Sequence, residues 1–379
     1  MIHALHRTAL ALLLALGAGG ALAHKASDSY LTLILADGGG VTGHWDIALR
    51  DLEEAVGLDA DGDGNVTWGE VRARHGAIAS YALSRLALAG DGRACTLRAG
   101  PQQIDEHTDG AYAVIPLAGE CPEKTARLTV DYRLLFDIDP QHRGLLRLEA
   151  GGRSVTGVLG PESVAQHYVT GEASLWRSLA EFVHEGMFHI WAGFDHLLFL
   201  AALLLPAVLV RGDGRWLPAH DGRKVIWTVA GIVTAFTLAH SITLALAVLG
   251  LVTPPTRWVE ALIAVSVIAA ALDNLRPFIP GPRWSMAFVF GLVHGFGFAS
   301  VLIDLHLPAE VLAVSLVGFN LGVEVGQLAV VGALLPLAYF ARATAAYPRR
   351  VVGLGSSAIA MIAGGWLVDR AFDLNWMPF

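Results

Sequence analysis

The sequence predicts an α-helical polytopic membrane region of six spans, preceded by an exported β-rich region that contains one EF-hand-like loop. Three observations predict this class: an apolar segment near the N-terminus, short alternating segments up to residue 170, and long apolar segments after residue 175. Of the 379 residues, 54% are hydrophobic and 16% are charged, whereas soluble domains carry about 25% charged residues. This composition argues against a wholly soluble globular protein and excludes intrinsic disorder. The net charge of −8 and the lack of a basic run exclude a nucleic-acid partner.

Residues 1–23 have the pattern of a secretory signal peptide. Arg7 precedes the apolar run Ala9–Leu16, and the small-x-small pattern Ala21–Ala23 follows it. The alternative is an uncleaved span, although the run is short for a bilayer core of about 30 Å. Cleavage before His24 would leave an α-amine beside an imidazole, a pair that can chelate Cu(II). An incidental histidine after the cleavage site is the simpler interpretation.

Residues 24–170 are predicted to form a periplasmic β-rich region, either a small antiparallel sheet or a sandwich. Apolar and polar residues alternate in short runs, several of them separated by Asp-Gly and Gly-Gly turns. The clearest runs are Tyr30–Leu35, Tyr112–Leu117, Ala126–Leu135 and Gly144–Leu148. Helical sequence at residues 67–88 interrupts them. In an oxidising compartment Cys95 and Cys121 could form one disulfide; two free buried thiols are the alternative.

The sharpest motif is a twelve-residue EF-hand-like loop at residues 59–70. Ca²⁺ takes six to eight oxygen ligands, which such a loop supplies from its positions 1, 3, 5, 7, 9 and 12. These positions are occupied by Asp59, Asp61, Asp63, Asn65, Thr67 and Glu70. Gly64 permits the sharp turn in the middle of the loop. The loop is unpaired, which suits a structural clip better than a sensor, and an Asp/Gly-rich surface turn is the alternative.

Residues 175–379 contain six apolar segments that are long enough to cross a bilayer. They are Ile190–Val210, Val225–Leu249, Trp258–Leu275, Ser285–Ile303, Val311–Phe340 and Val351–Val368. A helix at Leu175–Phe188 precedes them and suits the membrane interface. Nine Lys and Arg residues fall in the loops on one side and two on the other, which assigns the first side to the cytoplasm. We expect a bacterial inner-membrane protein whose N-terminal region and C-terminus are periplasmic.

Ionisable and amide side chains lie in or beside these spans, where a charge costs at least a few kcal/mol and indicates a function or a buried partner. They are His184, His189, Asp195, His196, His240, His294, Asn320, Glu324 and Gln327. In a continuous first helix, the first four would form two neighbouring stripes. Asn320, Glu324 and Gln327 would share one face of the fifth span.

The mid-span groups His240, His294 and Glu324 are candidates to bind one divalent cation, which Asp195 and His196 would deliver. Imidazole combined with carboxylate suits nickel, cobalt, zinc or iron. Asn320 and Gln327 would support the site through hydrogen bonds. A proton relay and a hydrogen-bonded packing network without metal are the alternatives.

The pattern His189-x-x-x-Gly193-x-Asp195-His196, followed by the His240 and His294 segments, resembles the HupE/UreJ family of bacterial membrane proteins. The resemblance covers about residues 180–370. It implies a nickel or cobalt permease in which His189, Asp195 and His196 are the first metal contacts. Short members often have Pro where this chain has Ile190, and they lack the exported region, so this chain resembles a long form.

The leading hypothesis is therefore a transition-metal permease. No G-x-x-x-x-G-K-[ST] loop occurs, so transport would be passive or ion-coupled. One alternative is an intramembrane metal-dependent hydrolase, in which three ligands and an open position activate water. Another is a non-catalytic anchor for a calcium-binding exported region. The sequence leaves a homo-oligomer and a periplasmic partner open.

Overall fold

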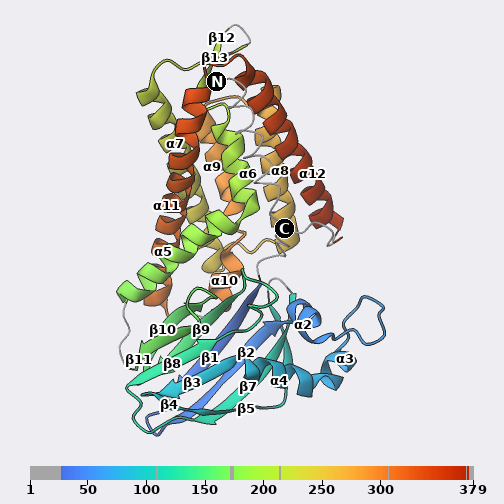
Figure 1. Ribbon diagram of the computed structural model, residues 1–379, viewed down its shortest axis with the longest axis vertical. Helices are drawn as coiled ribbons and strands as arrows, with labels where there is room; N and C mark the ends of the chain where they lie inside the picture. The colour runs from blue at the N-terminus through green and yellow to red at the C-terminus, as the bar shows by residue number, and fades with distance from the viewer. Residues whose placement is uncertain are drawn as a thin grey trace.

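The computed structural model describes residues 27–107, 110–170, 175–212, 215–305, 307–372 and 374. The predicted signal peptide and His24 lie outside these residues. Figure 1 shows two regions stacked along the long axis of the molecule: a β-rich region and a region of long helices. The loop 59–70 projects from the side of the β-rich region.

Two sheets face each other in the β-rich region. The first has the strand order β10-β9-β1-β2-β7-β5, with β6 also paired to β7, and the second has the order β11-β8-β3-β4. The strands are β1 (Asp28–Leu35), β2 (Gly40–Ala48), β3 (Leu86–Gly90), β4 (Arg93–Ala94), β5 (Thr96–Ala99), β6 (Gln103–His107), β7 (Gly110–Glu120), β8 (Arg127–Tyr132), β9 (Arg143–Ala150), β10 (Arg153–Leu159) and β11 (Ala165–Val169).

One strand pair differs from the antiparallel arrangement expected from the sequence, because β1 and β9 run parallel. More than a hundred residues separate these two strands along the chain. Parallel pairs need a crossover connection, and the alternation within each strand carries no information about such a distant partner. The sandwich itself agrees with the alternating runs of the sequence.

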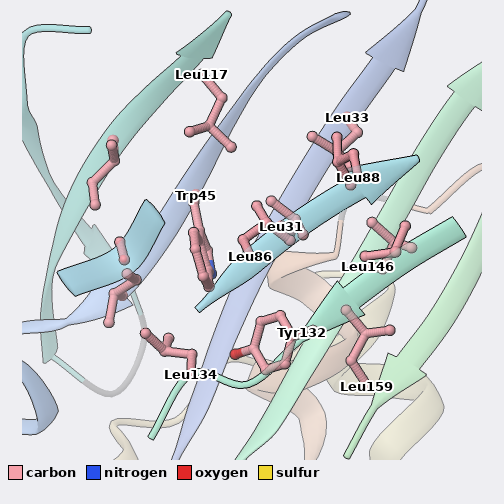
Figure 2. Packing of buried hydrophobic residues seen from close by; sticks show 14 of the residues in the cluster. Leu31, Leu33, Trp45, Leu86, Leu88, Leu117, Tyr132, Leu134, Leu146 and Leu159 are labelled. Atoms are coloured by element: carbon pink, nitrogen blue, oxygen red, sulfur yellow. The ribbon is translucent and has the colours of Figure 1, made fainter. Parts of the chain in front are cut away.

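The space between the two sheets is filled by alternate side chains of both. Figure 2 shows Leu31 and Leu33 of β1 beside Leu86 and Leu88 of β3, with Trp45 and Tyr132 among them. Trp45 is fully buried, and its indole N–H donates to Ser29 Oγ at 3.0 Å. Burial of such large apolar side chains stabilises the fold, and the hydrogen bond satisfies the one polar atom of the indole.

Three short helices and a disulfide complete the β-rich region. The helices are α2 (Leu49–Val56), α3 (Trp68–Ala73) and α4 (His75–Ser84). The helical sequence expected at residues 67–88 thus forms two helices and ends before β3 begins. Thr67 starts α3 through a capping box with Glu70. Cys95 and Cys121 are joined by a disulfide.

Among the described residues, four helices of the second region are long and apolar enough to cross a membrane: α7, α8, α11 and the joined pair η1–α12. The bent pair α5 and α6 would make a fifth span. The bounds in this region are α5 (Leu175–Ala192), α6 (Phe194–Leu204), β12 (Leu209–Gly212), β13 (Arg215–Pro218), α7 (Gly222–Val248), α8 (Thr256–Leu275), α9 (Arg283–His294), α10 (Ala299–Asp304), α11 (Ala309–Ala341), η1 (Tyr347–Leu354) and α12 (Gly355–Phe372).

Two of the six expected spans are not continuous helices. The segment Ile190–Val210 is bent by 71° at Gly193 and ends in the hairpin β12–β13. The segment Ser285–Ile303 is divided into α9 and α10 by a turn at residues 295–298. Glycine lies at both breaks, where it lowers helix stability, but glycine is also frequent in unbroken membrane helices. Composition alone therefore did not reveal the breaks.

The glycine repeat of α11 allows the close helix approach expected from the sequence. Gly318, Gly322 and Gly326 face α5, and a Cβ on residue 326 would lie 3.1 Å from the Met187 Cα atom. At residue 322 an added Cβ would overlap the Val183 carbonyl oxygen. Small residues of this kind let two membrane helices pack backbone to backbone. The contact holds α5 obliquely across α11 (Figure 1).

Candidate metal centre

The bend between α5 and α6 brings polar side chains of two short helices together. Gly193 leaves the helical conformation, with φ −74° and ψ 101°. A Cβ at this position would lie 2.7 Å from the His189 carbonyl oxygen and 2.9 Å from His196 Nδ1, so a larger residue would clash. As a result, His189 at the end of α5 and His196 in the first turn of α6 have ring centroids 4.5 Å apart.

Four histidines from four helices surround this bend. His196 is central, because its ring centroid lies 5.2 Å from that of His294 and 6.4 Å from that of His240. Ligand atoms of His189, His196 and His240 all lie within 4.8 Å of one another. Those of Asp195, His196 and His294 do so as well. We call these five residues the histidine cluster.

Four ring nitrogens of the cluster are buried and have no hydrogen-bond partner among the described residues. They are Nε2 of His189, His196 and His240, and Nδ1 of His294. Leaving a buried polar atom unpaired costs about 1–3 kcal/mol. Imidazole nitrogens grouped at this spacing are a common donor set for divalent transition metals. The cluster therefore offers ring-nitrogen lone pairs that no hydrogen bond among the described residues uses and that a cation could accept.

Neighbouring side chains determine which nitrogen of two of the rings faces inward. The Asn320 amide donates to the Leu316 carbonyl at 2.8 Å and presents its oxygen to His240 Nδ1 at 3.3 Å. His240 Nδ1 is therefore the donor, and Nε2 keeps its lone pair. His196 Nδ1 donates to Asp195 Oδ1 at 2.9 Å, which likewise leaves its Nε2 as a lone-pair donor.

His294 is oriented through α8. The Ser266 hydroxyl donates to the Ile263 carbonyl at 2.6 Å, so it accepts the N–H of His294 Nε2 at 2.9 Å. His294 Nδ1 then presents a lone pair towards Asp195 Oδ2, 3.9 Å away. Two acceptors that face each other need a proton or a cation between them.

An apolar shell surrounds the cluster. His240 is fully buried and His294 is 1% exposed. Phe298 lies 5.0 Å from the His189 ring and stacks on Phe319 at 4.0 Å between centroids. A shell of this kind limits water access and strengthens electrostatic interactions inside.

Three other residues predicted from the sequence lie outside the cluster. Glu324 accepts a hydrogen bond from Thr234 at 2.8 Å, and it is absent from both ligand groups among the described residues. Gln327 accepts from Thr237 at 3.1 Å. His184 is half exposed and lies 3.5 Å from Glu185. Asn320 contacts His240, whereas Glu324 shares no ligand group with His240 or His294 among the described residues. The metal-binding roles expected for these residues stay predictions.

The loop 59–70 has several local features of an EF-hand loop. Asp59, Asp61 and Glu70 offer oxygens within 4.8 Å of one another. Asp59 Oδ2 accepts the Gly64 N–H at 2.9 Å, and Gly64 has φ +83° at the turn. Hydrogen bonds from the Thr67 backbone, then from its hydroxyl and from Ala60, lower the pKa of Glu70 to about 2. Glu70 is therefore ionised at neutral pH.

Two residues beside the cluster were missed in the sequence. Ser266 orients His294, and Phe298 packs against His189. A serine within an apolar span could have been noted as a hydrogen-bonding group, but its partner is 28 residues away. Phe298 carries no signal among the many apolar residues around it.

Apolar helices arranged around buried imidazoles define a helical membrane protein whose interior can accommodate a divalent metal. The HupE / UreJ protein family matches residues 165–370, more than half of the chain, from β11 through most of α12. The chain belongs to the HupE/UreJ family, which is associated with the handling of divalent metals in membranes, nickel and cobalt in particular. No curated protein matches the chain.

Proposed function

We propose that the protein is a permease for a divalent transition metal such as nickel or cobalt. The observation that carries this proposal is that the four histidines of the two adjoining ligand groups each keep one buried ring nitrogen without a hydrogen-bond partner among the described residues. His189, His196 and His240 would replace the hydration shell of the ion, and Asp195 with His294 would offer the adjacent position. Because His196 belongs to both ligand groups, it would stay in contact as the ion moves.

A polar seam between α7 and α11 supports a route away from the cluster. It begins at the contact of His240 with Asn320 and continues through Thr237 with Gln327 to Thr234 with Glu324. Along α7 (Gly222–Val248) these contacts run from the C-terminal third of the helix to its middle. In this proposal Glu324 exchanges a proton with the passing cation or with the coupling ion.

The proposed orientation places the β-rich region in the periplasm, after removal of residues 1–23, and the basic loops in the cytoplasm. Leu244 and Ala247, near the end of α7, share a buried cluster with residues of the β-rich region. Arg283 and Arg342 belong to the opposite helix ends, where they contact Asn274 and the Ala219 carbonyl. An arginine-rich side facing the cytoplasm agrees with the charge rule for membrane proteins.

The test combines bound metal with flux. Purified full-length protein is loaded with nickel or cobalt, freed of loose ions and analysed for elemental content. His240→Ala/His294→Ala should lose the transition metal, while His220→Ala, an exposed histidine of the helical region, should keep it. Radioactive nickel uptake into proteoliposomes should follow the same order. Unchanged uptake in the double variant, with normal protein levels, would overturn the proposal.

A metal-dependent intramembrane hydrolase is the second candidate, favoured by one observation. Three histidines with an ionisable carboxylate nearby also describe a catalytic metal site with an open position. Asp195 would then act as the base, although its Oδ1 atom is engaged by His196. Tightly held zinc that no proteoliposome assay can move would favour this alternative over transport.

We also propose that the loop 59–70 binds Ca²⁺ and that the bound ion stabilises the connection between α2 and α3. The grouped oxygens of Asp59, Asp61 and Glu70 support this proposal, with Asp63, Asn65 and Thr67 completing the ligand set. Terbium luminescence sensitised by Trp68 would test it, because Trp68 lies in the loop and is half exposed. Glu70→Gln should weaken binding by about tenfold or more. Trp68→Phe should remove the signal yet leave calorimetric Ca²⁺ binding intact.

A further inference from the structure

His107 joins the two regions of the molecule through two carboxylates. Its Nε2 atom lies 3.3 Å from Asp46 Oδ2 of β2, and its Nδ1 atom lies 3.3 Å from Asp304 Oδ2 at the end of α10. The His107 side chain is 7% exposed, and its ring stacks on Tyr112 at 4.1 Å and on Tyr30 at 5.1 Å. The contact thus closes a buried interface between the β-rich region and the helical region.

The geometry requires a particular protonation state. A neutral imidazole carries one N–H, so it could donate to only one of the two carboxylates. The other carboxylate would then face a ring lone pair in a buried site, at a considerable energetic cost. An imidazolium carries an N–H on both ring nitrogens, and its charge forms an ion pair with Asp46 on one side and with Asp304 on the other. The protonated ring is therefore the form that both neighbouring carboxylates favour.

The carboxylates also shift the titration of the ring. Burial on its own would lower the pKa of His107, but the neighbouring carboxylates of Asp304 and Asp46 outweigh it and raise the pKa to about 9. Among the described residues, the phenols of Tyr30 on β1 and Tyr112 on β7 also lie against the ring. Since the ordinary histidine pKa is about 6.5, the contact is fully formed below about pH 6.5. It is lost as the pH rises through about 9.

The helix on the far side of this contact reaches the histidine cluster. Asp304 ends α10, and Phe298 directly precedes that helix and packs on His189. Ala299, Leu302 and Leu305 are buried together with Tyr30 and Tyr112. A movement of the β-rich region away from α10 would therefore remove packing that holds α10, and with it Phe298, next to the cluster.

We propose that protonated His107 holds the β-rich region against α10, next to the histidine cluster, and that loss of this proton releases the contact. We call this contact the latch. The contact between the β-rich region and α10 does not depend on the proposed function. Its consequence, regulated access of the cation to His189, rests on the proposed permease function. The latch is closed at neutral and acidic pH and opens in alkaline solution.

Thiol labelling of a buried interface position measures the open fraction even when that fraction is small. Ala299→Cys places the reporter in α10, where residue 299 is 4% exposed, and Thr253→Cys in an exposed loop corrects for the pH dependence of the thiol. The native cysteines are paired and stay silent without reductant. A chelator is present throughout, so the readout needs no transition metal.

The normalised labelling rate at residue 299 should rise at least about tenfold from pH 7 to pH 9.5, which corresponds to one unit of differential pKa. His107→Gln should label rapidly already at pH 7 and lose the pH dependence. His44→Gln, an exposed histidine on β2, should behave like the wild type. Asp304→Asn, which leaves the β-rich region unaltered, should shift the opening to lower pH.

A flat wild-type profile, or an H107Q profile equal to that of H44Q, would overturn the latch. Neither result would bear on metal binding, which the elemental analysis measures separately. Conversely, H240A/H294A should keep the wild-type labelling profile even if it transports no metal.

Discussion

His142 in the β-rich region and His240 in the helical region are both completely buried, yet their nitrogens have different partners. His142 Nδ1 lies 2.6 Å from Ser27 Oγ, and Nε2 lies 2.6 Å from the Tyr132 hydroxyl. His240 has Asn320 at Nδ1 and no partner for Nε2 among the described residues. Burial alone therefore does not distinguish a structural imidazole from a metal ligand. In our proposal, the unpartnered nitrogen grouped with other imidazoles makes His240 a metal ligand, whereas the fully hydrogen-bonded His142 is structural.

The comparison is tested most strongly at His196, which belongs to both ligand groups of the cluster. His196→Ala should abolish transition-metal binding, because it removes a donor from each group at once. Ca²⁺ binding at residues 59–70 should be unaffected, since that loop belongs to the other region. Isothermal titration with nickel and then with calcium would measure both. Nickel affinity equal to that of the wild type would show that the unpartnered nitrogens are not ligands.

A smaller effect on metal affinity is expected at Asn320, which orients the proposed ligand His240 but is not itself a proposed ligand. Asn320→Leu removes the acceptor at His240 Nδ1, which frees the ring to rotate and to change tautomer. Loss of such an outer partner typically lowers metal affinity about 10–100-fold. Gln327→Leu removes a comparable amide from the same helix, one that contacts Thr237 and not a histidine. Equal losses in the two variants would assign the effect to helix packing.

The sequence predicted best what neighbouring residues determine. Most strands depend on positions close together in the chain, and the chain has two cysteines to pair, Cys95 and Cys121. Calcium binding by the loop 59–70 stays a prediction. Four of the long spans agree with helices, since their apolar composition alone meets the length that a bilayer requires. The family followed from His189, Asp195 and His196.

The prediction was weaker where the site depends on distant contacts. The break at Gly193 and the turn after His294 change which side chains meet. A glycine within an apolar run does not by itself predict such a break. Glu324 was grouped with His240 because both lie near the middle of a span, but the rotation of α11 directs Asn320 to His240 and Glu324 to Thr234. Depth can be estimated from sequence position, whereas rotation about the helix axis depends on packing.

The smallest predicted effect concerns His142, the hydrogen-bonded histidine of the β-rich region. Burial, together with the nearby Arg143 and Arg50 charges, lowers the pKa of His142 to about 3. The unfolded chain would bind a proton near pH 6.5, so the folded state is favoured above that pH. This contribution is lost as the pH falls towards 3. We expect the free energy of opening of β1, β8 and β9 to fall by a few kcal/mol at most between pH 6.5 and 4.

Hydrogen exchange of the full-length protein, corrected for the intrinsic pH dependence of exchange, would measure this loss. His142→Gln should lower the stability at neutral pH and flatten the profile, because glutamine has no charge to gain, whereas His44→Gln should keep the wild-type slope. Nickel binding by His142→Gln should equal that of the wild type. If this variant also lost nickel, a fully hydrogen-bonded imidazole would influence the metal centre, and the distinction drawn from unpartnered nitrogens would fail.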